Sequence, residues 1–290
     1  ALPICYLMIA GSRKGSLPLN LQGIWNDRVA PPWNCNYTVN INTQMNYWPT
    51  LMVNLPECYE PLLRFIRELA ESGKRTAREY YHAPGHVSHH NSDIWRMSTP
   101  VGAHLPGSGE WGFWQMSSGW LVRSLWEYYE YTLDEAWLRQ EGWAVIRSGA
   151  EFYLSQLTKN REGQWVLSPT TSPENCFLHE GQKTAVAESA AMSQAIVEDV
   201  LTICVSAAEI LNLQDAVAAS ASAALPGLKG YSVGREGELM EWNENFEEAD
   251  AHHRHISHLY GLHPGRAIRP EDKLAEACRV SLERRGDEST

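Results

Sequence analysis

The sequence lacks a long uninterrupted apolar run. None of its apolar stretches approaches the roughly 18 residues that a membrane-spanning helix requires, so no membrane span is expected. Basic residues are also scarce, because 24 Lys and Arg stand against 35 Asp and Glu, for a net charge of −11. An acidic chain is repelled by nucleic acids and by anionic membranes, so neither is expected as a partner.

Several motifs that mark large enzyme classes are missing as well. There is no GxSxG, Walker A or Rossmann glycine pattern, which argues against a serine hydrolase, a kinase or a dehydrogenase. The six cysteines are scattered without a CxxC pair, which argues against zinc ribbons and thioredoxin-like redox sites. No HExxH spacing is present either. We therefore expect no metal and no other cofactor.

The start of the chain shows no targeting signal. It begins without Met and without a basic segment followed by an apolar core, so no signal peptide is visible and the compartment stays open. A length of 290 residues allows one large domain or two, and nothing indicates an oligomeric state.

Apolar residues recur at helical spacing over most of the chain. The pattern predicts one strand, at 164–167, and helices at 3–10, 43–53, around 120–129, 188–211, 214–224 and 270–284. A further helix begins at Pro61, and another runs from a capping box at Thr132 and Glu135 to 157. The helix at 43–53 is expected to be kinked or broken at Pro49. Strands are few, so the predicted fold class is mainly α.

Long loops separate these helices and carry many of the twelve Trp and eleven His residues. Trp suits stacking on sugar rings and packing between helices equally well. Helix hairpins stacked in a ring would place the loops at one mouth, whereas a simple helix bundle, the alternative, leaves them unexplained. We therefore expect an α/α toroid whose mouth gathers Asn40, Asn42, Asp93, Glu174 and His255.

One carboxylate stands out. Glu174 lies in the segment 168–175, on a loop stiffened by Pro169 and Pro173, and three hydroxyls are expected to crowd the approach to it. Two carboxyls that flank a bond are the basic arrangement of glycoside hydrolysis, and Glu241, Asp250 and Asp287 are candidate partners. The alternative is a solvated loop acid near a helix start.

Two amides could hold a water molecule. Asn40 and Asn42 are spaced by two, so in extended backbone their side chains would point the same way. Amides bind a water or a substrate hydroxyl without adding charge. The alternative is that Asn42 caps the following helix.

Two histidine-rich segments follow, 89–95 and 252–258. Each could be a metal site or a sugar-binding lip, and a metal-dependent hydrolase is therefore a competing interpretation. Arg254 would repel a bound cation and suits recognition of hydroxyls and carboxylates better. The alternative is a polar loop with structural histidines.

Five motifs in order resemble the catalytic domain of glycoside hydrolase family 95. They are Leu19-Asn20-Leu21-Gln22-Gly23-Ile24-Trp25-Asn26, residues 39–49 (VNINTQMNYWP), Ser172-Pro173-Glu174-Asn175, residues 253–259 (HRHISHL) and Arg285-Gly286-Asp287. The resemblance runs from about residue 8 to the end. It implies an (α/α)6 barrel and α-L-fucosidase activity, notably on α-1,2-linked fucose, or the α-L-galactosidase activity of some members.

The resemblance also implies an inverting mechanism, with Glu174 as general acid and an Asp as general base acting through a water held by Asn40 and Asn42. The base matches Asp287, with Asp250 as the second choice. An acid must keep its proton near neutral pH, so Glu174 is expected to have a raised pKa. The substrate would be a fucosylated glycan, and the pocket residues would be Asp93, Trp95, Glu241, His253, His255 and His258.

The chain departs from the family pattern in extent. The β domains that usually flank the barrel are absent, and the barrel should continue past Asp287. We expect residues 1–290 to form a partial catalytic domain, with exposed apolar flanks on its first and last helices. An inactive sugar-binding barrel is the alternative of a different class. The family suggests a periplasmic or secreted location.

Overall fold

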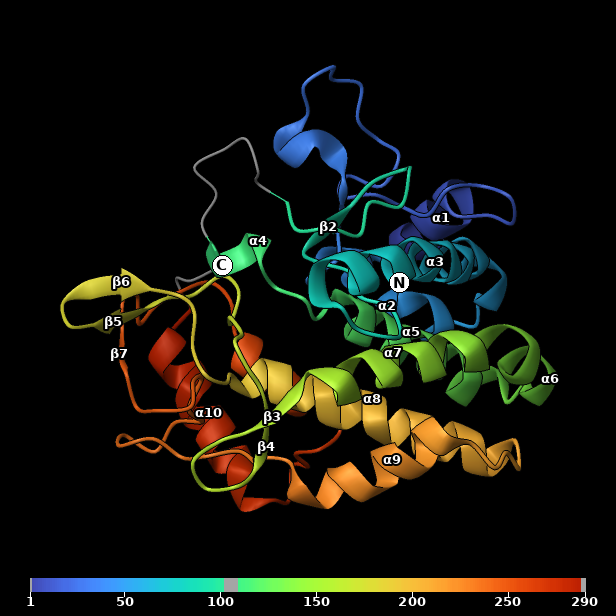
Figure 1. Ribbon diagram of the computed structural model, residues 1–290. Coiled ribbons are helices and arrows are strands. Elements are labelled where there is room, and N and C mark those ends of the chain that lie inside the picture. Colours follow the sequence, from blue (N-terminus) through green and yellow to red (C-terminus); the bar gives the residue numbers. More distant parts are fainter. Residues whose placement is uncertain (1, 102–108, 288–290) are drawn as a thin grey trace.

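The computed structural model describes residues 2–101 and 109–287, and this part of the chain is mostly helical (Figure 1). The helices are α1 (Leu2–Gly11), α2 (Asn42–Met52), α3 (Glu60–Tyr81), α4 (Gly109–Gly112), α5 (Ser117–Thr132), α6 (Glu135–Trp137), α7 (Trp143–Gln156), α8 (Ala191–Ile210), α9 (Ala216–Ala224) and α10 (Lys273–Arg285). A π-helical turn, Leu138–Gly142, joins α6 to α7. The mainly α fold class is confirmed.

The strands are short and antiparallel. β1 (Tyr37–Thr38) pairs with β2 (Asn91–Ser92), and β3 (Leu157–Lys159) pairs with β4 (Trp165–Leu167). A third sheet has the order β6 (Gln182–Thr184), β5 (Phe177–His179), β7 (Glu247–Glu248). Each sheet ties together two or three loops, so the strands hold loops in place and add little to the core.

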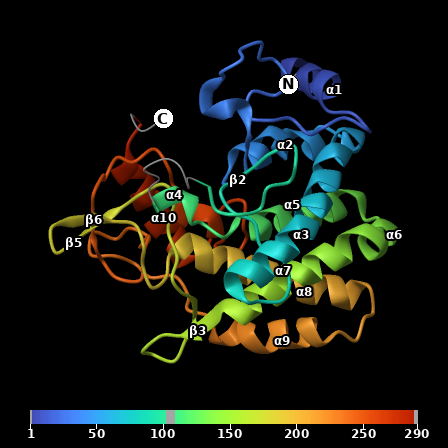
Figure 2. The same cartoon turned by 45° about the horizontal axis from the view of Figure 1, so that its top comes forward.

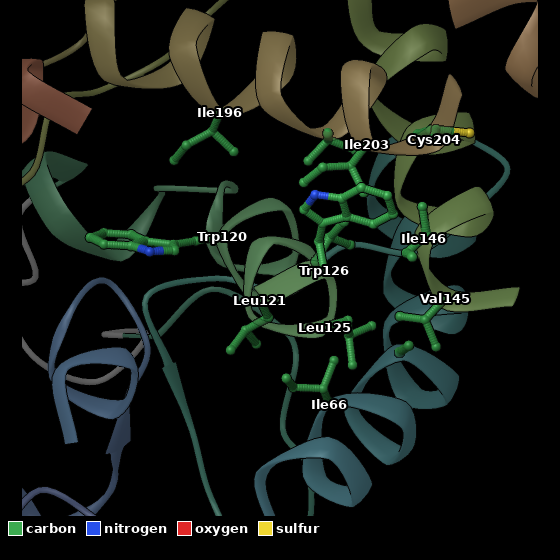
Figure 3. Close-up of a cluster of buried hydrophobic side chains, with 14 of the residues drawn as sticks. Ile66, Trp120, Leu121, Leu125, Trp126, Val145, Ile146, Ile196, Ile203 and Cys204 are labelled. Carbon is green, nitrogen blue, oxygen red and sulfur yellow. The ribbon is translucent and has the colours of Figure 1, made fainter. Parts of the chain in front are cut away.

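The core lies between α3, α5, α7 and α8. Leu121 and Leu125 of α5 point toward Ile66 of α3, while α7 contributes Val145 and Ile146 (Figure 3). These side chains recur every three or four residues along their helices, which places them on one face of each helix. Burial of that apolar face is the main source of stability for helices of this length.

Helix α8 is the one helix of the described chain that is long and apolar enough to cross a membrane. Two thirds of its apolar window is buried (67%), and it packs against α5, α7 and α9. Its composition is therefore that of a central core helix. It begins at Ala191, later than the predicted residue 188, because Ala190 is still extended and bridges to Trp242.

The predicted cap of the helix after α5 was wrong, and of the two outcomes predicted at Pro49, a kink or a break, the break does not occur. The helix after α5 is capped by Asp134, whose Oδ1 accepts from the Trp137 amide at 2.9 Å, and not by Thr132. Thr132 still belongs to α5, and its hydroxyl donates to the Tyr128 carbonyl at 2.8 Å. Helix α2 runs through Pro49 without a break.

The first helix has an exposed apolar flank, as expected. Ile4, Tyr6, Leu7 and Ile9 of α1 are between 41% and 67% exposed. On the last helix the expectation holds for one large apolar side chain, Leu282. Such a face promotes association when nothing covers it.

The loops gather at one end of the helical layer. In Figures 1 and 2, α4, β5, β6 and α10 lie together on the left, while α6 and the link between α8 and α9 lie on the right. The left end carries the sheet that follows the Glu174 loop, whereas β2 lies above α2 in Figure 1.

Candidate active site

Glu174 lies on the loop between β4 and β5, with its side chain 21% exposed. Its Oε1 is 3.1 Å from His90 Nε2, and its Oε2 accepts from Arg254 Nη2 at 2.6 Å. The segment 253–258 packs against the same loop, since the Ser257 hydroxyl donates to the Pro173 carbonyl. Three segments distant in the sequence thus meet at one carboxylate.

The hydroxyls that precede Glu174 do not crowd it, which corrects the prediction. Ser172 is buried and donates to Glu241 Oε1 at 2.6 Å, and Thr170 Oγ1 is 2.6 Å from Ser193 Oγ. Thr171 is also fully buried. Thr170 and Ser172 anchor the loop to α8 and to Glu241, while the Glu174 carboxylate contacts His90 and Arg254.

Glu241 supports the loop from behind. It is buried, and besides Ser172 it accepts from Asn175 Nδ2 at 3.1 Å and from Arg285 Nη2 at 2.7 Å. Burial raises its pKa, and the charge of Arg285 opposes that effect. Protein groups take up both oxygens, so this predicted pocket residue acts here as an anchor.

The histidines of the 253–258 segment divide into two kinds. His258 is buried, and burial lowers its pKa to about 3. His253 and His255 are partly exposed, with ring centroids 5.2 Å apart. Burial lowers the pKa of both, although the Glu174 charge opposes this at His255. His255 therefore lies close enough to Glu174 for each group to shift the pKa of the other.

Asn40 reaches the same place from β1. The Val39 amide donates to the His90 carbonyl at 2.9 Å, so the 39–40 segment lies beside the histidine that touches Glu174. Asn40 is buried, and among the described residues no group donates to its Oδ1. A buried acceptor without a donor is unfavourable by about 1–3 kcal/mol. Such an oxygen is suited to bind a hydroxyl or a water.

The backbone at the asparagine pair is not extended, contrary to the prediction. Residues 39–41 form a turn, and Asn42 is the first residue of α2, half-buried. The helix cap position belongs to Ile41, so Asn42 does not cap the helix. The two side chains are therefore set by a turn and a helix start.

Asp93 and Trp95 lie after β2. Asp93 Oδ1 accepts from the amides of Trp95 and Met97, at 2.9 and 3.0 Å, and so closes a turn. The Trp95 side chain is 82% exposed. A different tryptophan, Trp111, lies against the His90 ring, with centroids 5.4 Å apart.

Asp287 follows α10 and is exposed. Arg285, two residues earlier, binds Glu241 and Glu248, which brings this end of α10 to the Glu174 loop. Asp250 is close in the same region, since its Oδ1 accepts from the His252 amide at 3.1 Å and His252 Nδ1 lies 3.1 Å from the Arg285 carbonyl oxygen. Both candidate bases thus lie on segments that border the site.

The pKa of Glu174 is lowered to about 2, opposite to the prediction. Burial by itself raises it, but the hydrogen bond from His90 and the charges around His255, His90 and Arg254 outweigh burial. The sequence shows a loop acid among aromatic residues, and only the fold brings a guanidinium to Oε2.

Metal ligation finds no support in the described residues. Residues 2–101 and 109–287 contain no group of three or more His, Cys, Asp or Glu side chains arranged to hold an ion. All six cysteines are free thiols.

Sequence reasoning did not select two residues that shape the site, His90 and Trp111, and it singled out Arg254 only as a group suited to recognise hydroxyls and carboxylates. His90 stood out only as one of two adjacent histidines, and its contact with Glu174 spans 84 positions. No spacing pattern along the chain could reveal such a contact.

Comparison with known proteins identifies the family of the chain. The model of the glycosyl hydrolase family 95 catalytic domain matches residues 5–290. Alpha-L-fucosidase 2 of Arabidopsis thaliana is 40% identical over 287 residues, 98% of this chain and 34% of the relative. Probable alpha-fucosidase A of Aspergillus niger is 31% identical over 269 residues, 91% and 33% of the two chains.

The chain spans about a third of the length of these relatives. A solved structure, a putative kojibiose phosphorylase from human microbiome, shares the fold with a TM-score of 0.52 at 12% identity, over 78% of this chain and 29% of its own. Because the family model matches almost every residue, the chain belongs to glycoside hydrolase family 95, within the catalytic domain of that family.

Proposed function

We propose that this chain is the catalytic part of an α-L-fucosidase that removes terminal fucose from glycans, with α-1,2-linked fucose preferred, by inversion. The observation that carries the proposal is the carboxylate of Glu174, held between His90 and Arg254, with the buried Asn40 following Val39, whose amide donates to the His90 carbonyl. The names of the relatives supply the sugar. Residues 1–290 would form one part of an (α/α)6 ring.

Glu174 would be the general acid. Its Oε2 is held by Arg254, whose side chain is 57% exposed and can therefore be reached by a substrate. A glycosidic oxygen that took the place of Arg254 would remove a positive charge from the carboxylate and raise its pKa. The acid would thus become protonated only with substrate in place.

Asp287 would be the base, with Asp250 as the second choice. Asn40 and Asn42 would orient the attacking water through neutral hydrogen bonds, and Asp287 would accept its proton. Room for that water requires carboxyl groups roughly 6.5–9.5 Å apart in the reacting complex. His253, His255, Asp93 and Trp95 would border the sugar, with Glu241 and His258 supporting the loop.

The test is product analysis with the natural full-length protein on fucosyllactose and on an L-galactoside counterpart. We expect fucose release, with β-L-fucose as the first anomer seen by proton NMR. α-L-Fucose as the first product would refute inversion. Binding without turnover would support a sugar-binding barrel, and loss of activity with a chelator would support a metal hydrolase.

A further inference from the structure

One buried carboxylate, that of Glu241, holds the Glu174 loop on both sides of Glu174. Its Oε1 accepts from the Ser172 hydroxyl at 2.6 Å, and its Oε2 accepts from Asn175 Nδ2 at 3.1 Å. Ser172 lies two residues before Glu174 and Asn175 one residue after it, and both are buried, as is Glu241. The position of the Glu174 backbone is therefore fixed by a contact on each side of it.

The guanidinium of Arg285 joins Glu241 to the segments that carry the two candidate bases. Its Nη2 donates to Glu241 Oε2 at 2.7 Å, and its Nη1 donates to the Ala251 carbonyl at 2.9 Å. Ala251 follows Asp250, and Arg285 itself stands two residues before Asp287. The connection to Glu241 is therefore the same whichever of the two aspartates is the base.

Arg285 has little freedom to move. Its Nη1 also binds Glu248 of β7, and β7 pairs with β5, the strand that follows the Glu174 loop. The Arg285 carbonyl oxygen lies 3.1 Å from His252 Nδ1, and its side chain is buried. A guanidinium is planar and presents its N–H groups in fixed directions, so three acceptors determine where it lies.

On the basis of the acid and base roles proposed above, we propose that Arg285 and Glu241 are positioning residues that set the distance between the acid and the base. Inversion requires roughly 6.5–9.5 Å between the two carboxyl groups. Glu241 places the acid through Ser172 and Asn175, and Arg285 places the base relative to Glu241. A misplacement of about 1 Å lowers the rate of such a reaction about 100-fold.

The test measures kcat and KM of the full-length protein with fucosyllactose and with a nitrophenyl fucoside, whose leaving group needs no protonation. Ser172→Ala loosens the acid side alone. Its kcat should fall about tenfold with fucosyllactose and much less with the nitrophenyl fucoside. Arg285→Lys keeps the charge but cannot keep all three contacts, so it loosens both sides. Its kcat should fall about tenfold or more with both substrates, with a smaller change in KM.

A double-mutant cycle separates positioning from general damage. In a Glu174→Gln protein the acid is already lost, so the addition of Ser172→Ala should lower the residual turnover of fucosyllactose little further. The addition of Arg285→Lys should still lower it, because the base must still be positioned. If the losses from Ser172→Ala and Glu174→Gln were additive, Ser172 would not act through the acid, and the proposal would be overturned.

Arg279→Met controls for changes to α10. Arg279 pairs with Glu276 and Glu283 on the surface, so kcat should stay unchanged with both substrates. A lowered melting temperature with unchanged kcat in Arg285→Lys would show that the pair is structural only and would refute the positioning role. If Arg285→Lys does not fold, Arg285→Met combined with Glu241→Gln decides by the same measurement. Full turnover of fucosyllactose by Glu174→Gln would instead refute the acid role itself.

Discussion

Arg285 is the side chain whose loss should disturb both the stability and the site. It lies at the end of α10, and its side chain and that of Glu241 are each 4% exposed. Its guanidinium binds Glu241, Glu248 and the Ala251 carbonyl. Removing one partner of a buried ion pair destabilises a protein by about 3–5 kcal/mol, because the other charge stays buried. We expect that range for Arg285→Met.

The expected shift in melting temperature is roughly 6–10 °C, since a domain of this size loses about 2 °C per kcal/mol. Thermal unfolding followed by calorimetry or circular dichroism at pH 7 measures it. Adding Glu241→Gln should restore much of the loss, because the more deeply buried partner then carries no charge and Glu248 still pairs with Arg284. The loss should also shrink as the pH is lowered, because burial raises the pKa of Glu241 above its usual 4.5 and a protonated Glu241 needs no counter-charge.

Arg279→Met is the matched control. Arg279 lies on the same helix and pairs with Glu276 and Glu283 on the surface. It should melt like the unmodified protein. If Arg285→Met and Arg279→Met melted alike, or if Glu241→Gln made the loss worse, the anchoring role of the Arg285–Glu241 pair would be refuted.

Three further predictions concern the site and the core. Arg254→Gln should move the basic limb of kcat/KM on fucosyllactose to higher pH, since the charge that lowers the Glu174 pKa is lost; a shift to lower pH would contradict this. Folding lowers the pKa of Glu174 from 4.5 to about 2. The stability that the ionised Glu174 contributes to the fold is therefore complete above the unfolded pKa near 4.5 and is lost as the pH falls toward 2. Denaturant titrations of the unmodified protein and of Glu174→Gln should give converging free energies of unfolding over that window. Gly119→Ala should destabilise by about 1–3 kcal/mol, because its Cβ would lie 2.5 Å from Ile196 Cγ2 where α5 meets α8; unchanged urea unfolding would show that α8 can move away.

The sequence by itself determined the helices and the candidate acid. Apolar spacing located α3, α5, α7 and α8, because each buries one continuous face and the pattern that does so is local. Glu174, Asn40 and Arg254 were visible as polar residues in long loops. Local signals failed at helix boundaries, where Asp134 rather than Thr132 satisfies the free amides.

Only the tertiary structure decided the chemistry around Glu174. Its pKa follows from His90 and Arg254, which lie 84 and 80 positions away in the sequence. Glu241 became an anchor because α10 returns to place Arg285 beside it. Proton affinity depends on charges within a few ångströms, and which charges those are is set by how the loops pack.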